Sequence, residues 1–209
     1  MDYIQQLIAT YPRLISQKES IMAACEKIIH CYQSNGKLLI AGNGGSAADA
    51  DHIVGELMKG FVKKRSINLE LISKIEQLDP INGSTIASKL QLSLPAIALS
   101  AHTALGTAII NDSDGTNIYA QQIMGYGNPG DVFMGISTSG NAKNVYHAIV
   151  VSKAKELTAI ALTGGTGGLI AGIADISIIV PESETYRIQE LHLPIYHAIC
   201  LTVEEFFFK

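Results

Sequence analysis

Two pairs of side chains in this sequence have types and spacings that suit acid–base or metal chemistry. His52 and Glu56 stand four residues apart, so in a helix they share one face. A histidine and a carboxylate in this arrangement can hold a divalent metal or act as a proton-transfer pair. Gln189 and His197 are eight residues apart, slightly over two helical turns, so both can project to one side. Histidine–glutamate pairs at this spacing are common surface contacts, and a lone histidine on an apolar helix is more often a satisfied core or surface residue than a ligand.

A run of hydroxyl side chains, Ser137-Thr138-Ser139 followed by Gly140-Asn141, lies between an apolar segment and a helical one. Hydroxyls and backbone N–H groups at the start of a helix form a good phosphate cradle without formal positive charge. A single hydroxyl would satisfy an N-cap. Three in succession exceed that need, and the run therefore predicts phosphate binding.

The segment Gly42-Asn43-Gly44-Gly45-Ser46 also connects an apolar run to a helical pattern. Glycines allow backbone N–H groups to close on an anion, although a purely structural tight turn fits as well. The segment loosely matches a dinucleotide fingerprint. However, no acidic residue closes the next strand, which ends Ala98-Leu99-Ser100, and this weighs against a nicotinamide-dependent oxidoreductase.

The elements that must position these residues alternate between strands and helices. Residues 2–34 read as two helices separated by Pro12. Five apolar segments read as strands, at 37–41, 95–100, 131–136, 158–163 and 175–180. Helical patterns follow at 46–60, 101–110, 115–125, 142–156 and 185–207.

The strand segments are nearly continuous apolar runs, which is typical of parallel strands buried on both faces. We therefore expect an α/β fold, a three-layer α/β/α sandwich with five parallel strands in the order 2-1-3-4-5. The ligand crevice is then expected at the carboxyl ends of the strands.

Residues 62–92 lie outside this alternation. We interpret them as an inserted loop with a short helix inside a single domain of residues 1–209, and both a lid and a partly disordered segment fit the pattern. The basic run Lys63-Lys64-Arg65 is expected to be a solvated part of that loop.

Composition excludes several classes of protein. Apolar residues make up 47% and charged residues 16% of the chain, which is a globular composition. The net charge of −4 argues against broad binding to nucleic acid or to an anionic membrane. The odd number of cysteines, without framework spacing, predicts reduced thiols and a cytoplasmic location. No apolar stretch is long enough to span a membrane.

Several blocks of the sequence, taken together and in this order, resemble the SIS-domain phosphoheptose (sedoheptulose 7-phosphate) isomerases. The blocks are Ala41-Gly42-Asn43-Gly44-Gly45-Ser46 with Asp49, His52 and Glu56; Gly135 to Asn141; Leu162-Thr163-Gly164; and Arg187-Ile188-Gln189-Glu190-Leu191-His192 with His197. They span most of the chain, and the set is far more specific than any one block.

The resemblance implies a cytoplasmic homotetramer that isomerises a sugar phosphate by metal-assisted enediol proton transfer. Active sites between subunits and assembly through the N-terminal helices in residues 1–34 are implied as well. Sedoheptulose 7-phosphate and D-glycero-D-manno-heptose 7-phosphate are the implied substrate and product.

The resemblance also implies residue roles. Glu56 would be the general base and His197 a general acid or base. Zinc would be held by His52, Glu56, Gln189 and His197. The substrate would contact Asn43, Gly44, Ser46, Ser137, Thr138, Ser139, Asn141 and Gln189.

The sequence departs from the family pattern at several positions. Ala142 replaces the last serine of the phosphate loop, Tyr186 replaces an acid, and His102 or a neighbour stands where the family has another acid. The insert at 62–92 is also longer than in typical members. These departures lie where the hydroxyls of the sugar would be recognised, so they bear on its identity.

A non-catalytic SIS module that binds a sugar phosphate, or a protein partner such as a replication initiator, is the alternative. In such modules the acid–base positions are typically altered. In this sequence the unaltered residue types are all present, at His52, Glu56, Gln189 and His197, and this favours an enzyme over a non-catalytic module.

Overall fold

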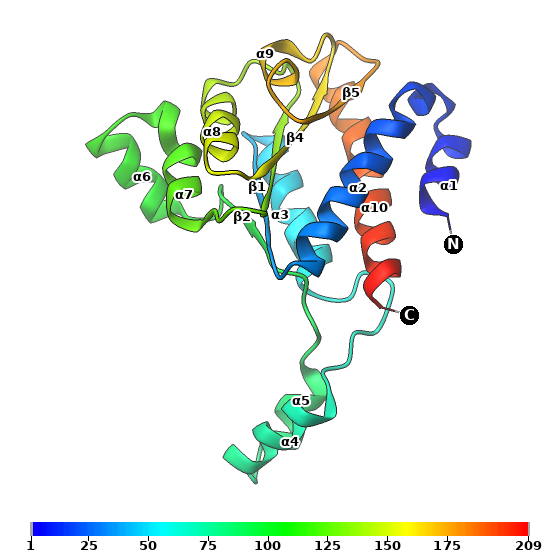
Figure 1. Ribbon diagram of the computed structural model, residues 1–209, viewed down its shortest axis with the longest axis vertical. Helices are drawn as coiled ribbons and strands as arrows, with labels where there is room; N and C mark the ends of the chain where they lie inside the picture. Colours follow the sequence, from blue (N-terminus) through cyan, green and yellow to red (C-terminus); the bar gives the residue numbers. More distant parts are fainter. Residues whose placement is uncertain (1, 209) are drawn as a thin grey trace.

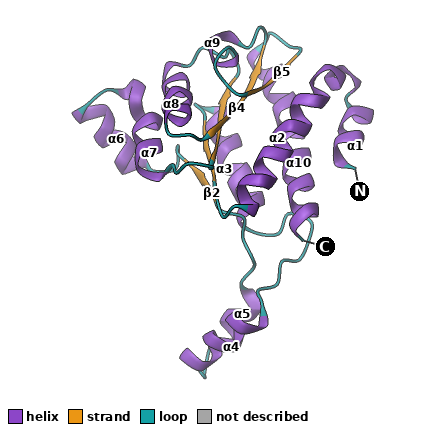
Figure 2. Ribbon diagram, in the orientation of Figure 1, coloured by secondary structure: helices purple, strands orange, loops and turns teal. Residues whose placement is uncertain are grey.

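A computed structural model describes residues 2–208 and contains a five-stranded parallel sheet in the order β2-β1-β3-β4-β5. The strands are β1 (Leu38–Ala41), β2 (Ala96–Ala98), β3 (Val132–Ser137), β4 (Thr158–Gly164) and β5 (Ile176–Val180). Both the strand order and the three-layer α/β sandwich are confirmed. Figure 1 shows the helices on the two sides of the sheet, and Figure 2 shows the same layers by secondary structure.

Residues along each strand alternate between two separate hydrophobic cores. Leu38 and Ile40 of β1 belong to the core under helices α2 (Lys18–Gln33), α3 (Gly45–Met58) and α10 (Thr185–Phe207). Leu39 and Ala41 belong to the core under α7 (Ile118–Tyr126) and α8 (Lys143–Ala154). Because both faces are covered, the strands read as unbroken apolar runs in the sequence.

The helices lie close to the expected ranges. They are α1 (Tyr3–Thr10), α2 (Lys18–Gln33), α3 (Gly45–Met58), α6 (Thr103–Asp112), α7 (Ile118–Tyr126), α8 (Lys143–Ala154), α9 (Gly168–Ala171) and α10 (Thr185–Phe207), with 3₁₀ turns η1 (Pro12–Gln17) and η2 (Gly115–Asn117). Both α3 and α10 follow strands and run back along the same face of the sheet. No helix between residues 2 and 208 has both the length and the apolar character needed to cross a bilayer.

The insert differs from the expectation of a loop with one short helix. It contains two helices, α4 (Leu69–Leu78) and α5 (Gly83–Lys89), which together project away from the body of the molecule (Figure 1). Asn68 caps α4 by accepting a hydrogen bond from Leu71 N at 2.8 Å. The apolar residues of this segment have a helical period that the polar Asn, Asp and Pro residues around them obscured in the sequence.

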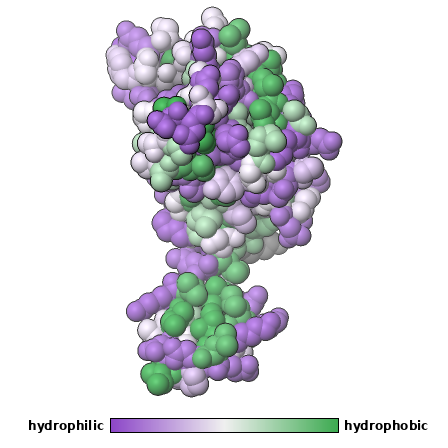
Figure 3. All heavy atoms as spheres, turned by 90° about the vertical axis from the view of Figure 1, so that its left-hand side faces the viewer, coloured by the Kyte–Doolittle hydropathy of each residue, from purple (hydrophilic) through white to green (hydrophobic). Residues whose placement is uncertain are grey.

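The projecting hairpin is amphipathic and leaves large apolar side chains in solvent. Leu69, Leu78 and Ile81 are each more than 80% exposed. Figure 3 shows apolar atoms gathered on the face of this lobe that the view presents. The size of this apolar surface is unusual for a segment that stands alone in water.

The base of the insert corrects the expectation that Lys63-Lys64-Arg65 is a solvated loop. Arg65 is 1% exposed, and its guanidinium pairs with Glu204 of α10 at 2.9 Å. Arg65 also donates to the carbonyl oxygens of Glu56 and Leu57 in the last turn of α3, at 3.0 and 2.5 Å. These carbonyls have no partner within the helix, so Arg65 satisfies the end of α3.

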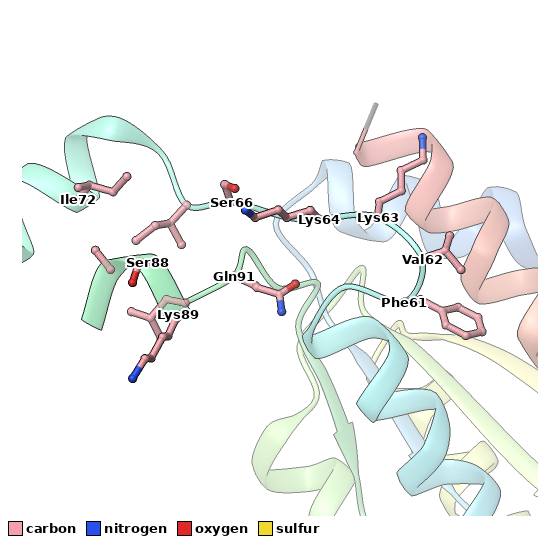
Figure 4. A pocket seen from close by; sticks show the side chains of 12 residues that line it. Phe61, Val62, Lys63, Lys64, Ser66, Ile72, Ser88, Lys89 and Gln91 are labelled. Carbon is pink, nitrogen blue, oxygen red and sulfur yellow. The ribbon is translucent and has the colours of Figure 1, made fainter. Parts of the chain in front are cut away.

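A cavity of 530 Å³ lies where the insert leaves the body. Figure 4 shows Phe61, Val62 and Lys63 on the segment that leaves α3, Ser88 and Lys89 at the end of α5, and Gln91 on the segment that returns from α5 to the body. Gln91 Oε1 accepts a hydrogen bond from Gly60 N at 2.9 Å, which links the segment leaving α3 to the segment returning from the insert.

Candidate active site

Helix α3 presents three polar side chains on one face. Asp49, His52 and Glu56 are spaced at i, i+3 and i+7, which places them in a row along the helix. His52 Nε2 lies 3.2 Å from Glu56 Oε1, and Lys59 Nζ lies 3.4 Å from Glu56 Oε2. The His52 side chain is 42% exposed and that of Glu56 only 12%, so the carboxylate lies deeper than the imidazole.

Helix α10 brings His197 to this row. The ring centroids of His52 and His197 are 5.0 Å apart, and the Phe61 ring lies 5.4 Å from His197 on another side. Nε2 of His197 is buried, and none of residues 2–208 offers it a hydrogen-bond partner. Burial lowers the pKa of His197, the nearby His52 lowers it further, and Glu56 opposes this shift. The imidazole is therefore neutral at pH 7 and can accept a proton.

Tyr196, the neighbour of His197, joins the two helices through its hydroxyl group. The hydroxyl donates to Asp49 Oδ1 at 3.2 Å and lies 3.0 Å from His52 Nδ1. Burial raises the pKa of Asp49, while the hydrogen bond from Tyr196 and the nearby His52 oppose the rise. Sequence reasoning missed Tyr196 because an aromatic residue in an apolar helix reads as core.

Gln189 lies at the other end of the contact between α3 and α10. Its amide packs against Gly45, where an added Cβ would stand 2.4 Å from Gln189 Nε2. Gly45 and His52 are seven residues apart, which is roughly 10 Å along a helix axis. The structure thus gathers His52, Glu56 and His197 in one place and sets Gln189 near the start of α3.

The hydroxyl run lies where β3 ends and α8 begins, as expected. Ser137 is buried, Thr138 is half-buried and Ser139 is exposed. The loop is held closely, because an added Cβ on Gly140, whose φ is +64°, would lie 1.9 Å from the carbonyl oxygen of Gly167. Asn141 accepts from Leu169 N at 3.1 Å and donates to Ser139 O at 2.9 Å, so its side chain braces the loop.

The glycine-rich loop lies beside this one. The amides of Asn43 and Asn144 exchange hydrogen bonds at 3.0 and 2.9 Å, which links the start of α3 to the start of α8. Gly44 has a φ of +55°, and Ser46 is buried in the first turn of α3. Asn144 is a second residue that sequence reasoning missed, since it lies three positions beyond the motif.

His197 and Asn141 line two separate cavities. His197 lines a cavity of 190 Å³ with residues of α1, and Asn141 lines a cavity of 430 Å³ with Lys143 and His147. Among residues 2–208, no group of three or more His, Cys, Asp or Glu side chains is arranged to hold a metal ion. The roles predicted for these site residues stay predictions.

His192, also on α10, is buried in the protein, and its burial should make the stability of the fold depend on pH. It is fully buried, and its Nε2 lies 3.2 Å from Thr163 O. Burial lowers the pKa of His192 to about 4, although the contact with Thr163 acts in the opposite direction. In the unfolded chain the pKa is about 6.5, so protons bind preferentially to the unfolded state below that pH.

The stability that neutral His192 contributes is therefore complete above pH 6.5 and is lost as the pH falls from 6.5 toward about 4. At pH 5 the expected loss is roughly 2 kcal/mol, since one pKa unit is worth about 1.4 kcal/mol. Urea unfolding at pH 7.5 and pH 5 measures it. The variant His192→Gln should show a pH dependence that is weaker by this amount, and parallel curves for the two proteins would contradict the assignment.

Comparison with known proteins gives the site a context. The family profile for the SIS domain matches residues 2–91 and 81–164. The phosphoheptose isomerase of Aneurinibacillus thermoaerophilus is 39% identical over 100% of this chain and 96% of its own length. That of Sulfurimonas denitrificans is 37% identical over 97% of this chain and 89% of its own length.

Two solved structures share the fold at full length. The phosphoheptose isomerase from Francisella tularensis superposes with a TM-score of 0.75 at 28% identity, covering 97% of this chain and 95% of that one. The phosphoheptose isomerase from Neisseria gonorrhoeae superposes with a TM-score of 0.71 at 33% identity, covering 96% of this chain and 91% of that one.

Proposed function

This chain belongs to the SIS-domain family of phosphoheptose isomerases, and we propose that it interconverts sedoheptulose 7-phosphate and D-glycero-D-manno-heptose 7-phosphate. Membership of this family identifies the chain as a sugar-phosphate isomerase. The identity of the sugar is what we propose. The observation that carries it is the meeting of His52, Glu56 and His197 in a chain that aligns end to end with these isomerases.

The reaction moves a proton between adjacent carbons through an enediol. The Glu56 carboxylate, deep in the site and 3.2 Å from His52, is the base that removes the carbon-bound proton. His197, which is neutral because burial lowers its pKa, transfers the hydroxyl proton. Each such group typically contributes about 10²–10⁴-fold to the rate.

The phosphate end of the substrate would bind at Ser137, Thr138 and Ser139. Backbone N–H groups at the start of α8 add partial positive charge there. Anchoring the phosphate orients the distant carbonyl end and lowers the entropic part of the barrier. Asn43, Gly44 and Ser46, on the adjoining loop, would contact the sugar chain, and Gln189 reaches the same end of α3.

Zinc is part of the proposal. His52, Glu56 and His197 would hold it where α3 meets α10, and Gln189, which stands near the start of α3, would complete the set only after its side chain turns toward them. The nitrogen and oxygen donors suit zinc, and the buried, unpartnered Nε2 of His197 supports a ligand at that atom. Bound zinc would polarise the substrate carbonyl as a Lewis acid. Elemental analysis of the purified protein should find about one zinc per chain, and its loss in the His197→Asn variant would test the ligand set. Equal zinc content in both proteins would contradict it.

We further propose a cytoplasmic homotetramer. Three free, buried cysteines support a reducing compartment, and the exposed apolar side chains of α4 and α5 support association. Light scattering should give about four times the chain mass of 22.3 kDa, and a monomeric mass would refute the assembly.

The activity can be tested by ¹H NMR of sedoheptulose 7-phosphate incubated with the zinc-loaded protein in D₂O. We expect the anomeric signals of the aldose phosphate to appear, with deuterium at C2, because the enediol takes its proton from solvent-exchanged groups. Sedoheptulose without phosphate should convert far more slowly. Binding of the phosphate ester without any conversion or exchange would instead favour a non-catalytic SIS module.

A further inference from the structure

The hydroxyl group of Tyr119, on α7, is bonded to the glycine-rich loop that precedes α3. It donates to the carbonyl oxygen of Gly42 and lies 3.1 Å from Asn43 Oδ1. Tyr119 is buried, and its ring belongs to the core under α7 and α8. Burial raises the pKa of Tyr119, so its hydroxyl stays protonated at neutral pH and can donate. The loop is thus held by a buried donor from a helix that carries none of the predicted site residues.

The orientation of the Asn43 amide follows from a chain of hydrogen bonds that begins at a backbone group. Val145 N lies 3.0 Å from one amide atom of Asn144, and because a backbone N–H can only donate, that atom is the oxygen. Asn144 Oδ1 also accepts from Asn43 Nδ2 at 3.0 Å, and Asn144 Nδ2 donates to Asn43 Oδ1 at 2.9 Å. Exchanging the oxygen and nitrogen of Asn43 would set donor against donor and acceptor against acceptor.

Only one hydrogen-bonding group of the Asn43 side chain is left for a ligand. Its oxygen has two lone pairs, and Tyr119 and Asn144 supply one donor to each. One N–H of Nδ2 is directed to Asn144, and the other has no acceptor among residues 2–208. Asn43 is exposed, and it follows β1 directly beside the end of β3, where the hydroxyl loop begins. The side chain therefore presents a single N–H donor at this edge of the sheet and accepts nothing.

We propose that Tyr119 and Asn144 are positioning residues that fix the Asn43 amide as a hydrogen-bond donor to an oxygen of the substrate. The proposal rests on the proposed function, in which Asn43 contacts the sugar chain. An amide that rotates freely can donate or accept, and it loses side-chain entropy when a ligand binds. An amide held in advance avoids that loss and selects an oxygen that accepts.

The first test is Tyr119→Phe, which removes only the hydroxyl. We expect the KM for sedoheptulose 7-phosphate to rise about 3–10-fold with little change in kcat, because the weakened hydrogen bond is made in both the bound substrate and the transition state. The matched control is Tyr32→Phe. Tyr32 is also buried, and its hydroxyl has no hydrogen-bond partner in the described part of the chain, so KM and kcat should both stay unchanged.

The decisive measurement repeats Tyr119→Phe in the Asn43→Ala variant. Because the tyrosine acts through the amide, its hydroxyl should have no further effect on KM once the amide is gone, and the two changes should be non-additive. An equal rise in KM in both backgrounds would make Tyr119 a merely structural residue and overturn the proposal, as would a wild-type KM in Tyr119→Phe. Should Tyr119→Phe fail to fold, Asn144→Ala removes the other anchor and is expected to show the same non-additivity.

A measurement without substrate separates this proposal from the proposed function. In ¹H–¹⁵N spectra of the full chain, the side-chain amide signals of Asn43 are those missing from Asn43→Ala. In the wild type the proton bonded to Asn144 should lie downfield of the free proton, and Asn144→Ala should bring the two signals together. Signals that do not respond to this substitution would refute the fixed amide. A fixed amide in a chain that does not turn over sedoheptulose 7-phosphate would remove the proposed reaction and leave the orientation of Asn43 standing.

Discussion

Glu56→Gln is expected to lower the turnover of sedoheptulose 7-phosphate by about 10²–10⁴-fold, the usual contribution of a general base. The amide keeps the shape of the side chain but cannot remove a proton from carbon. Steady-state kinetics by coupled assay or NMR measures the change, with zinc content determined for each protein.

The fold should survive this substitution. The polar contacts of the Glu56 side chain, which is 12% exposed, are with His52 and Lys59, and only its backbone carbonyl is bound by the buried Arg65. The matched control is Asp51→Asn on the same helix, an exposed carboxylate whose loss should leave kcat unchanged. Turnover of Glu56→Gln within about threefold of wild type would remove Glu56 from the role of base, because a lost base costs at least about 100-fold.

Glu204→Ala is expected to destabilise the protein by about 3–5 kcal/mol, because it leaves the Arg65 guanidinium buried without its counter-charge. Both side chains of this pair are fully buried. The Glu204 carboxylate also accepts hydrogen bonds from Phe61 N at 2.8 Å and Val62 N at 2.9 Å. A third backbone donor, Lys63 N, lies 3.3 Å from the same carboxylate, so the substitution leaves one buried charge and three backbone N–H groups without their partner.

Urea unfolding followed by circular dichroism, at one fixed protein concentration, measures this loss. Glu70→Ala is the control, since its ion pair with Lys74 is exposed and should contribute no more than about 1 kcal/mol. Similar unfolding midpoints for the two variants would contradict the idea that Glu204 anchors the insert. Turnover should fall as well, because Arg65 holds the carbonyl of Glu56.

The order and burial of the sheet were determined by the sequence itself. Apolar strand segments such as 131–136 and 158–163 carry their own signal, because a strand that is covered on both faces has no polar side. The position of Ser137–Ser139 between β3 and α8 was predictable for a related reason, since the apolar run before it and the helical pattern after it each carry their own signal. The pairing of His52 with Glu56 followed from helical spacing alone.

The meeting of α3 and α10 was decided only by the tertiary structure. The contacts of Tyr196 with Asp49 and His52 join residues 147 and 144 positions apart, and no local pattern encodes such a distance. The same holds for Arg65, which in the sequence is part of a basic run but in the fold pairs with Glu204, 139 positions away. Local periodicity records which face of an element is apolar, whereas the partner of a buried polar group depends on how the elements pack.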